Sequence, residues 1–224
     1  MAISLGGDGT MLRTVDLVYE TGAAVLGVNL GQMAYLAEVE LGELDDALER
    51  LLAGDFEIDE RMMVEVTVGS AGATVGRWWA LNEAVIEKTR SGRLVRLEVA
   101  INGTPFTTYA ADGVIVATPT GSTAYSFSAR GPIVSPRLRC LLLTPVSPHM
   151  LFDRSLVLAA EEELRFTVAA ERNVILTLDG REVAELGVGD TVTCTGGPKP
   201  ARMVTLGPRD FHQILKAKFG LPDR

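Results

Sequence analysis

The first thirty residues alternate between apolar runs and one segment with helical spacing. Residues 2–5 are mostly apolar, and a longer apolar run, AAVLGVNL, covers residues 23–30. Between these runs, apolar residues recur every three or four positions, and Gly22 follows as a C-terminal capping glycine would. A strand, a glycine loop, a helix and a near-continuous apolar strand predict a right-handed βαβ unit with buried parallel strands.

Two further segments carry the apolar stripe of an amphipathic helix. Residues 43–53 place their leucines on one face, with acidic residues early and Arg50 late, as the helix dipole prefers. Residues 210–219 repeat the pattern with Phe211, Ile214, Leu215 and Phe219. The first of these helices is interpreted as structural.

From about Phe56 the apolar positions recur with a period of two, as at residues 64–68, and residues 77–88 and 94–101 are also strand-like. Asn102-Gly103 and Asp179-Gly180 each separate strand-like runs, which is a strong hairpin signal. Residues 56–206 therefore predict a mostly-β, sandwich-like domain, interrupted by a short helix after Gly121.

Composition narrows the class of protein. The 224 residues are 47% hydrophobic and 22% charged, which is typical of a soluble protein with one large or two small domains. The net charge of −8 argues against nucleic acid or an anionic membrane as a partner. No apolar run approaches membrane length, and the N-terminus lacks a signal-peptide pattern. Cys140 and Cys194 are expected to be buried, reduced thiols, which fits a cytoplasmic location.

The glycine loop GGDGT, residues 6–10, lies where α/β sheets bind phosphates, at the end of a strand and the start of a helix. Asp8 is unexpected there, because a carboxylate repels phosphate. A catalytic or metal-binding role explains this acid, and capping of the following helix is the alternative. Two histidines and the absence of CxxC give no metal-ligand cluster, so no protein metal site is predicted.

Residues 112–128, DGVIVATPTGSTAYSFS, join an acidic turn and a short strand to a run of small and hydroxylated residues. Small residues let the backbone approach a ligand closely, and hydroxyls offer donors and acceptors without bulk. The alternative is an ordinary Pro/Gly turn in which Ser122 or Thr123 caps a helix that starts at Ala124.

Taken together, GGDGT, Asn82-Glu83 and residues 112–128 resemble the NAD kinases over nearly the whole chain. The long motif is specific, whereas diacylglycerol and sphingosine kinases and phosphofructokinases carry loops similar to GGDGT. The resemblance implies that the C-terminal helix returns to the α/β domain. We therefore expect a Rossmann-like α/β domain of residues 1–55 with 207–224, and an all-β domain of residues 56–206.

Members of that family carry further strand and helix units before the GGDGT strand, whereas five residues precede Gly6 here. We therefore expect an α/β domain that is incomplete relative to the family. A non-catalytic NAD-binding module is accordingly one alternative function. A lipid kinase is another, although TPTGSTAY is not expected in that class.

The resemblance implies phosphoryl transfer from ATP, or from polyphosphate in some members, to the 2′-hydroxyl of the adenosine ribose of NAD, which gives NADP. Mg²⁺ or another divalent cation would accompany the donor. Such a transfer depends mostly on positioning and charge neutralisation. An Asp with an ordinary pKa of about 4 is ionised at neutral pH and can accept the hydroxyl proton. Asp8 is the predicted base, and the N–H groups of Gly7 and Gly9 are predicted to face the donor phosphates.

The other site residues follow from the same resemblance. Asn82 and Glu83 suit the ribose diol, although a polar strand end is the ordinary interpretation of such a pair. Asp112 is assigned to the nicotinamide side of NAD. The remaining expected contacts are Arg13, Arg93, Thr120, Thr123, Ala124, Tyr125, Ser126, Phe127 and Ser128. A homodimer or homotetramer assembled through the β domain is also expected.

Overall fold

The computed structural model describes residues 1–31, 35–89, 93–169, 172–208 and 210–221. Contacts divide the chain into two compact units: unit 1 comprises residues 1–61 with 201–224, and unit 2 comprises residues 62–200. These boundaries differ from the expected ones because two strands, at residues 57–61 and 201–205, belong to the sheet of unit 1.

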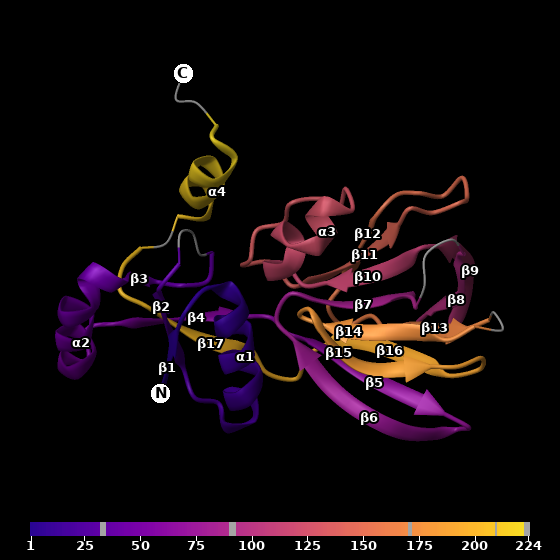
Figure 1. The fold of residues 1–224 in the computed structure, drawn as a ribbon, viewed down its shortest axis with the longest axis horizontal. Coiled ribbons are helices and arrows are strands. Elements are labelled where there is room, and N and C mark those ends of the chain that lie inside the picture. Colours follow the sequence, from indigo (N-terminus) through magenta and orange to yellow (C-terminus); the bar gives the residue numbers. More distant parts are fainter. Residues whose placement is uncertain (32–34, 90–92, 170–171, 209, 222–224) are drawn as a thin grey trace. The chain divides into compact units, whose positions relative to one another are not determined.

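Unit 1 contains the predicted βαβ unit (Figure 1). The strands β1 (Ala2–Leu5) and β2 (Val25–Asn29) pair in parallel, with Ala2 opposite Val25, and all five residues of β2 are buried. The strand β17 (Ala201–Thr205) pairs with β2 in parallel and with β4 (Glu57–Arg61) in antiparallel orientation. The elements are β1 (Ala2–Leu5), α1 (Asp8–Val18), η1 (Tyr19–Thr21), β2 (Val25–Asn29), β3 (Val39–Glu40), η2 (Leu41–Glu43), α2 (Leu44–Ala53), β4 (Glu57–Arg61), β17 (Ala201–Thr205) and α4 (Phe211–Phe219).

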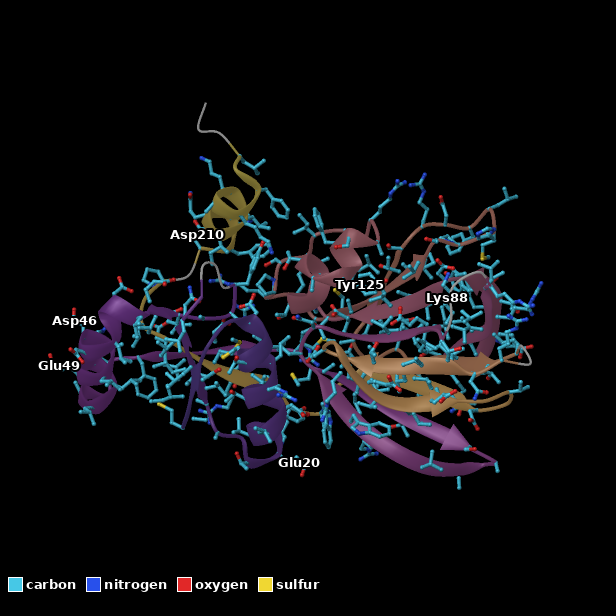
Figure 2. The ribbon with its side chains drawn as sticks, in the orientation of Figure 1. Glu20, Asp46, Glu49, Lys88, Tyr125 and Asp210 are labelled. Carbon is cyan, nitrogen blue, oxygen red and sulfur yellow. The ribbon has the colours of Figure 1, made fainter. Side chains whose placement is uncertain are left out.

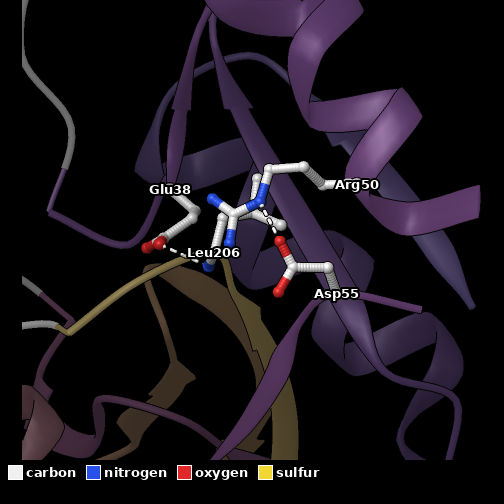
Figure 3. A network of polar contacts seen from close by, with 4 residues as sticks. All are labelled: Glu38, Arg50, Asp55 and Leu206. Carbon is white, nitrogen blue, oxygen red and sulfur yellow. Dashed lines mark hydrogen bonds and ion pairs between the residues drawn. The ribbon is translucent and has the colours of Figure 1, made fainter. Parts of the chain in front are cut away.

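Polar contacts join distant segments of unit 1 near α2 (Figure 3). Arg50, in the last turn of α2, pairs with Asp55 at 2.6 Å, and Gly54 between them takes the left-handed conformation that ends the helix. The Glu38 carboxylate accepts the N–H of Leu206 at 2.8 Å. This last contact fixes the chain just after β17, so the C-terminal segment belongs to the α/β unit as expected.

Unit 2 is a sandwich of two antiparallel sheets, each of six strands within the described residues. One aliphatic core is shared between them, with Val66, Val99 and Phe166 from one sheet and Val116 and Leu176 from the other. One sheet has the order β12 (Leu156–Ala159), β11 (Cys140–Val146), β10 (Gly113–Ala117), β7 (Glu83–Lys88), β14 (Val174–Leu178) and β15 (Arg181–Leu186). The other has the order β6 (Ala73–Ala80), β5 (Val64–Ser70), β16 (Thr191–Gly196), β13 (Leu164–Val168), β8 (Val95–Ile101) and β9 (Thr104–Ala111).

The hairpin signals in the sequence correspond to hairpins in the structure. Asn102-Gly103 joins β8 to β9, and Asp179-Gly180 joins β14 to β15, each pair with positive φ at both residues. The strand-like run of residues 77–88, by contrast, is divided at Leu81-Asn82 into β6 and β7, which lie in different sheets. That break places Asn82 and Glu83 at a corner of the sandwich.

Cys140 and Cys194 are both buried free thiols. Among the described residues, no helix is long and apolar enough to cross a membrane.

Candidate functional site

In unit 1 the glycine loop presents Asp8 at the first position of α1. Gly7 is the N-cap, and the helix start shows no side-chain cap. The Asp8 carboxylate instead accepts the backbone N–H of Tyr35, at 2.9 and 3.1 Å to its two oxygens, and that of Leu36 at 2.9 Å. The capping alternative for Asp8 is therefore not realised, because its carboxylate binds the segment that follows β2.

The backbone beside Asp8 borders open space. Apart from the adjacent backbone, no atom of the described residues lies within 4 Å of the position that a Cβ atom would occupy at Gly7 or at Gly9. Room for a ligand therefore exists next to the helix N-terminus, where backbone N–H groups attract anions. Arg13 lies further along α1 and is exposed.

In unit 2 the predicted pair Asn82-Glu83 is held by a third residue. The Asp179 carboxylate accepts three consecutive backbone N–H groups, from Leu81 at 2.8 Å, Asn82 at 2.8 Å and Glu83 at 3.1 Å. Sequence reasoning identified Asp179 only as a hairpin residue. Its partners lie almost a hundred residues away in the chain, so no local pattern could reveal this role.

Glu83 is buried, with 7% of its surface exposed, and its Oε2 atom has no hydrogen-bond partner among the described residues. Burial, followed by the charge of Asp179, raises the pKa of Glu83 to about 8, and the N–H of Tyr125 acts in the opposite direction. Unsatisfied buried oxygens are costly, so this atom is available for a hydrogen bond with a bound water or ligand. Close to neutral pH, the carboxyl group can donate or accept a hydrogen bond.

The segment after β10 packs directly on this corner. Thr118 donates its hydroxyl to the carbonyl of Leu81 and its N–H to the carbonyl of Asn82 at 2.8 Å. A side chain at Gly121 would overlap the backbone of Asn82, so only glycine allows this approach. Gly121 therefore serves the packing between the two parts of the site.

The capping alternative requires that Ser122 or Thr123 directs its hydroxyl to the start of the following helix, and neither residue does. The hydroxyl of Ser122 accepts the N–H of Val134 at 3.0 Å, and the helix α3 (Tyr125–Ser128) has Ala124 as its N-cap, with no side-chain cap. The prediction that Ser122 or Thr123 caps this helix is therefore wrong. Thr123 directs its hydroxyl to the carbonyl of Thr120, within the short helix η3 (Thr120–Thr123).

The other predicted residues of unit 2 differ in their exposure. Tyr125 and Phe127 are each 38% exposed, and Ser128 is also exposed. Thr120 is buried, and so is Ser126, whose hydroxyl is bonded to that of Thr144. Ser126 therefore directs its side chain into the interior.

Tyr125, which is labelled in Figure 2, lies within the electrostatic field of several acidic groups. Its pKa is raised by burial and then by the charges of Glu87, Asp112 and Glu83. Asp112 also pairs with Lys88. Lys88 and Arg93 line a cavity of about 620 Å³ in unit 2, together with Arg172, Glu185 and other residues.

Comparisons with known proteins identify the family of this chain. The model of the ATP-NAD kinase N-terminal domain matches residues 1–56, and that of the C-terminal domain matches residues 81–206. The chain is 44% identical over 219 residues to the NAD kinase of Heliobacterium modesticaldum, covering 97% of this chain and 77% of that protein. It is 45% identical over 217 residues to the NAD kinase of Moorella thermoacetica, covering 96% of this chain and 70% of that protein.

Solved structures give the same result for the fold. The crystal structure of yeast NADH kinase complexed with NADH matches with a TM-score of 0.91 and 29% identity, covering 99% of this chain and 66% of that one. An NAD kinase from Archaeoglobus fulgidus in complex with ATP matches with a TM-score of 0.75 and 24% identity, covering 97% of this chain and 80% of that one. The α/β and mostly-β fold expected from the sequence is confirmed, and the chain belongs to the NAD kinase family.

Proposed function

We propose that this protein transfers the γ-phosphoryl group of ATP, or of polyphosphate, to the 2′-hydroxyl of the adenosine ribose of NAD. The observation that carries the proposal is Asp8, a carboxylate fixed by two backbone N–H groups beside an open glycine loop. Membership of the NAD kinase family supports the same reaction.

In the proposed reaction, the 2′-oxygen forms a bond to the γ-phosphorus while the bond from that phosphorus to the β–γ bridging oxygen breaks. ADP leaves with the bridging oxygen, and the hydroxyl proton passes to the Asp8 carboxylate. The N–H groups of Tyr35 and Leu36 orient that carboxylate. The backbone at Gly7 and Gly9 leaves room for the donor phosphates.

The residues of unit 1 fit a divalent cation that arrives with the nucleotide. Mg²⁺ usually binds one or two carboxylates together with substrate phosphates, and Asp8 supplies a carboxylate next to the proposed phosphate position. Such a cation would neutralise charge on the donor. Within the described residues, no group of three His, Cys, Asp or Glu side chains is arranged to hold a metal ion.

Unit 2 is proposed to hold the nucleoside part of NAD. The unpartnered Oε2 of Glu83 suits a ribose hydroxyl, and Asn82 stands next to it in the chain. The ring of Tyr125 is accessible for the adenine, and Asp112 is proposed to face the nicotinamide amide. The complex of the related yeast kinase with NADH supports a dinucleotide in this family. A homo-oligomer and a cytoplasmic location remain parts of the proposal, the latter supported by the two buried thiols.

The test is formation of NADP by the purified chain from NAD, ATP and Mg²⁺, read with an NADP-specific dehydrogenase. Asp8→Asn should lower kcat by about 10²–10⁴-fold, the usual contribution of a general base. Asp16→Asn, a matched change of a partly buried carboxylate further along the same helix, should leave kcat within about twofold.

Two results would contradict the proposal. NAD binding without turnover in the parent chain would indicate a non-catalytic module. Full activity in Asp8→Asn would remove Asp8 from the role of base.

A further inference from the structure

The last turn of α4 brings a lysine to the residues that hold Asp8. The ammonium group of Lys218 lies over the ring of Tyr35, 2.9 Å from its centroid, and the backbone N–H of Tyr35 donates to the Asp8 carboxylate. The three residues come from the start of α1, the segment after β2 and the end of the chain, and all belong to unit 1. None of the sequence patterns connects them.

The surroundings of Lys218 are unlike those of a solvated surface lysine. Burial lowers the pKa of Lys218, and the charge of Asp8 acts in the opposite direction, so the ammonium lies within the field of that carboxylate. A partly desolvated cation on an aromatic face is held more strongly than one in water. The helix dipole alone explains a cation in the last turn of α4, but Lys216 also satisfies that preference.

The position of Lys218 gives a physical reason why an acid is tolerated in the glycine loop. The Asp8 carboxylate repels the phosphates of the donor that the proposed function brings next to it, and a nearby cation offsets that repulsion. We propose that Lys218 is a positioning residue that acts through Asp8: it holds the Tyr35 segment against the carboxylate and balances its charge when the anionic phosphoryl donor binds. This inference rests on the proposed function.

The first test measures binding of MgATP and of NAD to the intact chain by calorimetry. Lys218→Met should weaken MgATP binding about tenfold, as expected for loss of one partly desolvated charge contact, and should leave NAD binding within about twofold. Lys218→Arg keeps the charge and the contact with the ring, so it should bind MgATP within about threefold of the parent.

Lys216→Met is the matched control. It removes the same charge from the same helix turn, but a side chain two positions away leaves the helix in a different direction. MgATP binding by this variant should stay within about twofold of the parent. An equal loss in Lys216→Met and Lys218→Met would overturn the proposal, because it would indicate a general charge or helix effect.

The decisive measurement is a double-mutant cycle with Asp8→Asn. If Lys218 acts through the Asp8 carboxylate, Lys218→Met should cost less than about threefold in MgATP affinity once that carboxylate is an amide. An undiminished tenfold loss in the Asp8→Asn background would overturn the proposal. Circular dichroism establishes that each variant is folded, and Lys218→Gln replaces Lys218→Met in the cycle if the latter does not fold.

Because the readout is binding, this test differs from that of the proposed function. A parent chain that binds MgATP but makes no NADP would defeat the proposed function and leave the cycle interpretable. A parent that makes NADP, with MgATP affinity unchanged in Lys218→Met, would defeat only the role of Lys218.

Discussion

Unit 1 and unit 2 each contain one carboxylate central to the proposed chemistry, and their environments differ. Asp8 receives backbone N–H groups from Tyr35 and Leu36 and lies beside open space. Glu83 is buried, and one of its oxygens lacks a partner among the described residues. Hydrogen bonds to a carboxylate favour its charged form, whereas burial disfavours it.

These environments suit Asp8 and Glu83 to different roles in the proposed reaction. A carboxylate that is oriented by donors and accessible to a ligand suits proton acceptance. A carboxyl group whose pKa lies near 8 suits hydrogen bonding to hydroxyls in either protonation state. Asp179 holds the backbone at Glu83, whereas the helix that begins at Asp8 has no side-chain cap among the described residues.

The largest effect after loss of Asp8 itself is expected from Asp179→Asn. This change replaces one of the oxygens that accept the N–H groups of Leu81, Asn82 and Glu83, and asparagine tolerates the positive φ of 48° at this turn. Stability should fall by about 1–3 kcal/mol. The value of kcat/KM for NAD should fall by about ten- to a hundredfold, because the corner that carries Asn82 and Glu83, two of the residues proposed to contact NAD, shifts. Chemical denaturation and steady-state kinetics measure the two losses.

Asp190→Asn provides the control for that experiment. Asp190 also lies in a turn and accepts a backbone N–H, from Gly187 at 2.8 Å, but that turn does not carry the predicted site residues. The control should lose stability while kcat/KM for NAD stays within about twofold of the parent. Equal kinetic losses in both variants would mean that Asp179 has no special part in shaping the site.

An effect confined to a pH window is expected for Glu83→Gln. In the unfolded chain this carboxyl group has a pKa near 4.5, and burial, together with the charge of Asp179, raises the value in the folded chain to about 8. Between these values only the folded state holds the proton, so the contribution of Glu83 is fully present below pH 4.5 and is lost as pH rises through 8. The slope is on the order of 1 kcal/mol per pH unit.

Glu83→Gln should remove this slope, which urea denaturation of the parent and the variant between pH 5 and 8 would reveal. Glu98→Gln, an exposed carboxyl group on β8, serves as the control and should leave the slope unchanged. A parent whose slope equals that of Glu83→Gln would show that burial does not set Glu83 apart from an ordinary surface acid.

Local patterns in the sequence were sufficient for much of the fold. The helix of residues 43–53, the buried strand β2 within the apolar run of residues 23–30 and the turns at Asn102-Gly103 and Asp179-Gly180 all depend on neighbours within a few positions. The pairing of β17 with β2 depends on residues almost 180 positions apart, so the predicted domain boundary missed it.

The same limit applies to the candidate site. The motifs identified the segments, but the contacts that shape the acids come from distant parts of the chain. Asp179 reaches the corner at Asn82 across 97 positions, and Lys218 reaches Tyr35 from the last helix. The direction of a side chain is also not encoded locally, because Ser126 faces the interior although its neighbours Tyr125 and Phe127 are exposed.

The smallest effect on ligand binding is expected from Ser126→Ala, which separates an interior role from contact with NAD. The Ser126 hydroxyl lies 3.1 Å from that of Thr144, which in turn lies 2.9 Å from that of Ser155. Loss of one such buried hydrogen bond should cost about 1 kcal/mol in stability, while KM for NAD stays within about twofold. The double variant Ser126→Ala, Thr144→Val should lose less stability than the sum of the losses in the two single variants, because both changes break the same contact. A raised KM for NAD at unchanged stability would instead place the Ser126 hydroxyl on the ligand and give unit 2 a polar contact beyond the corner at Asn82 and Glu83.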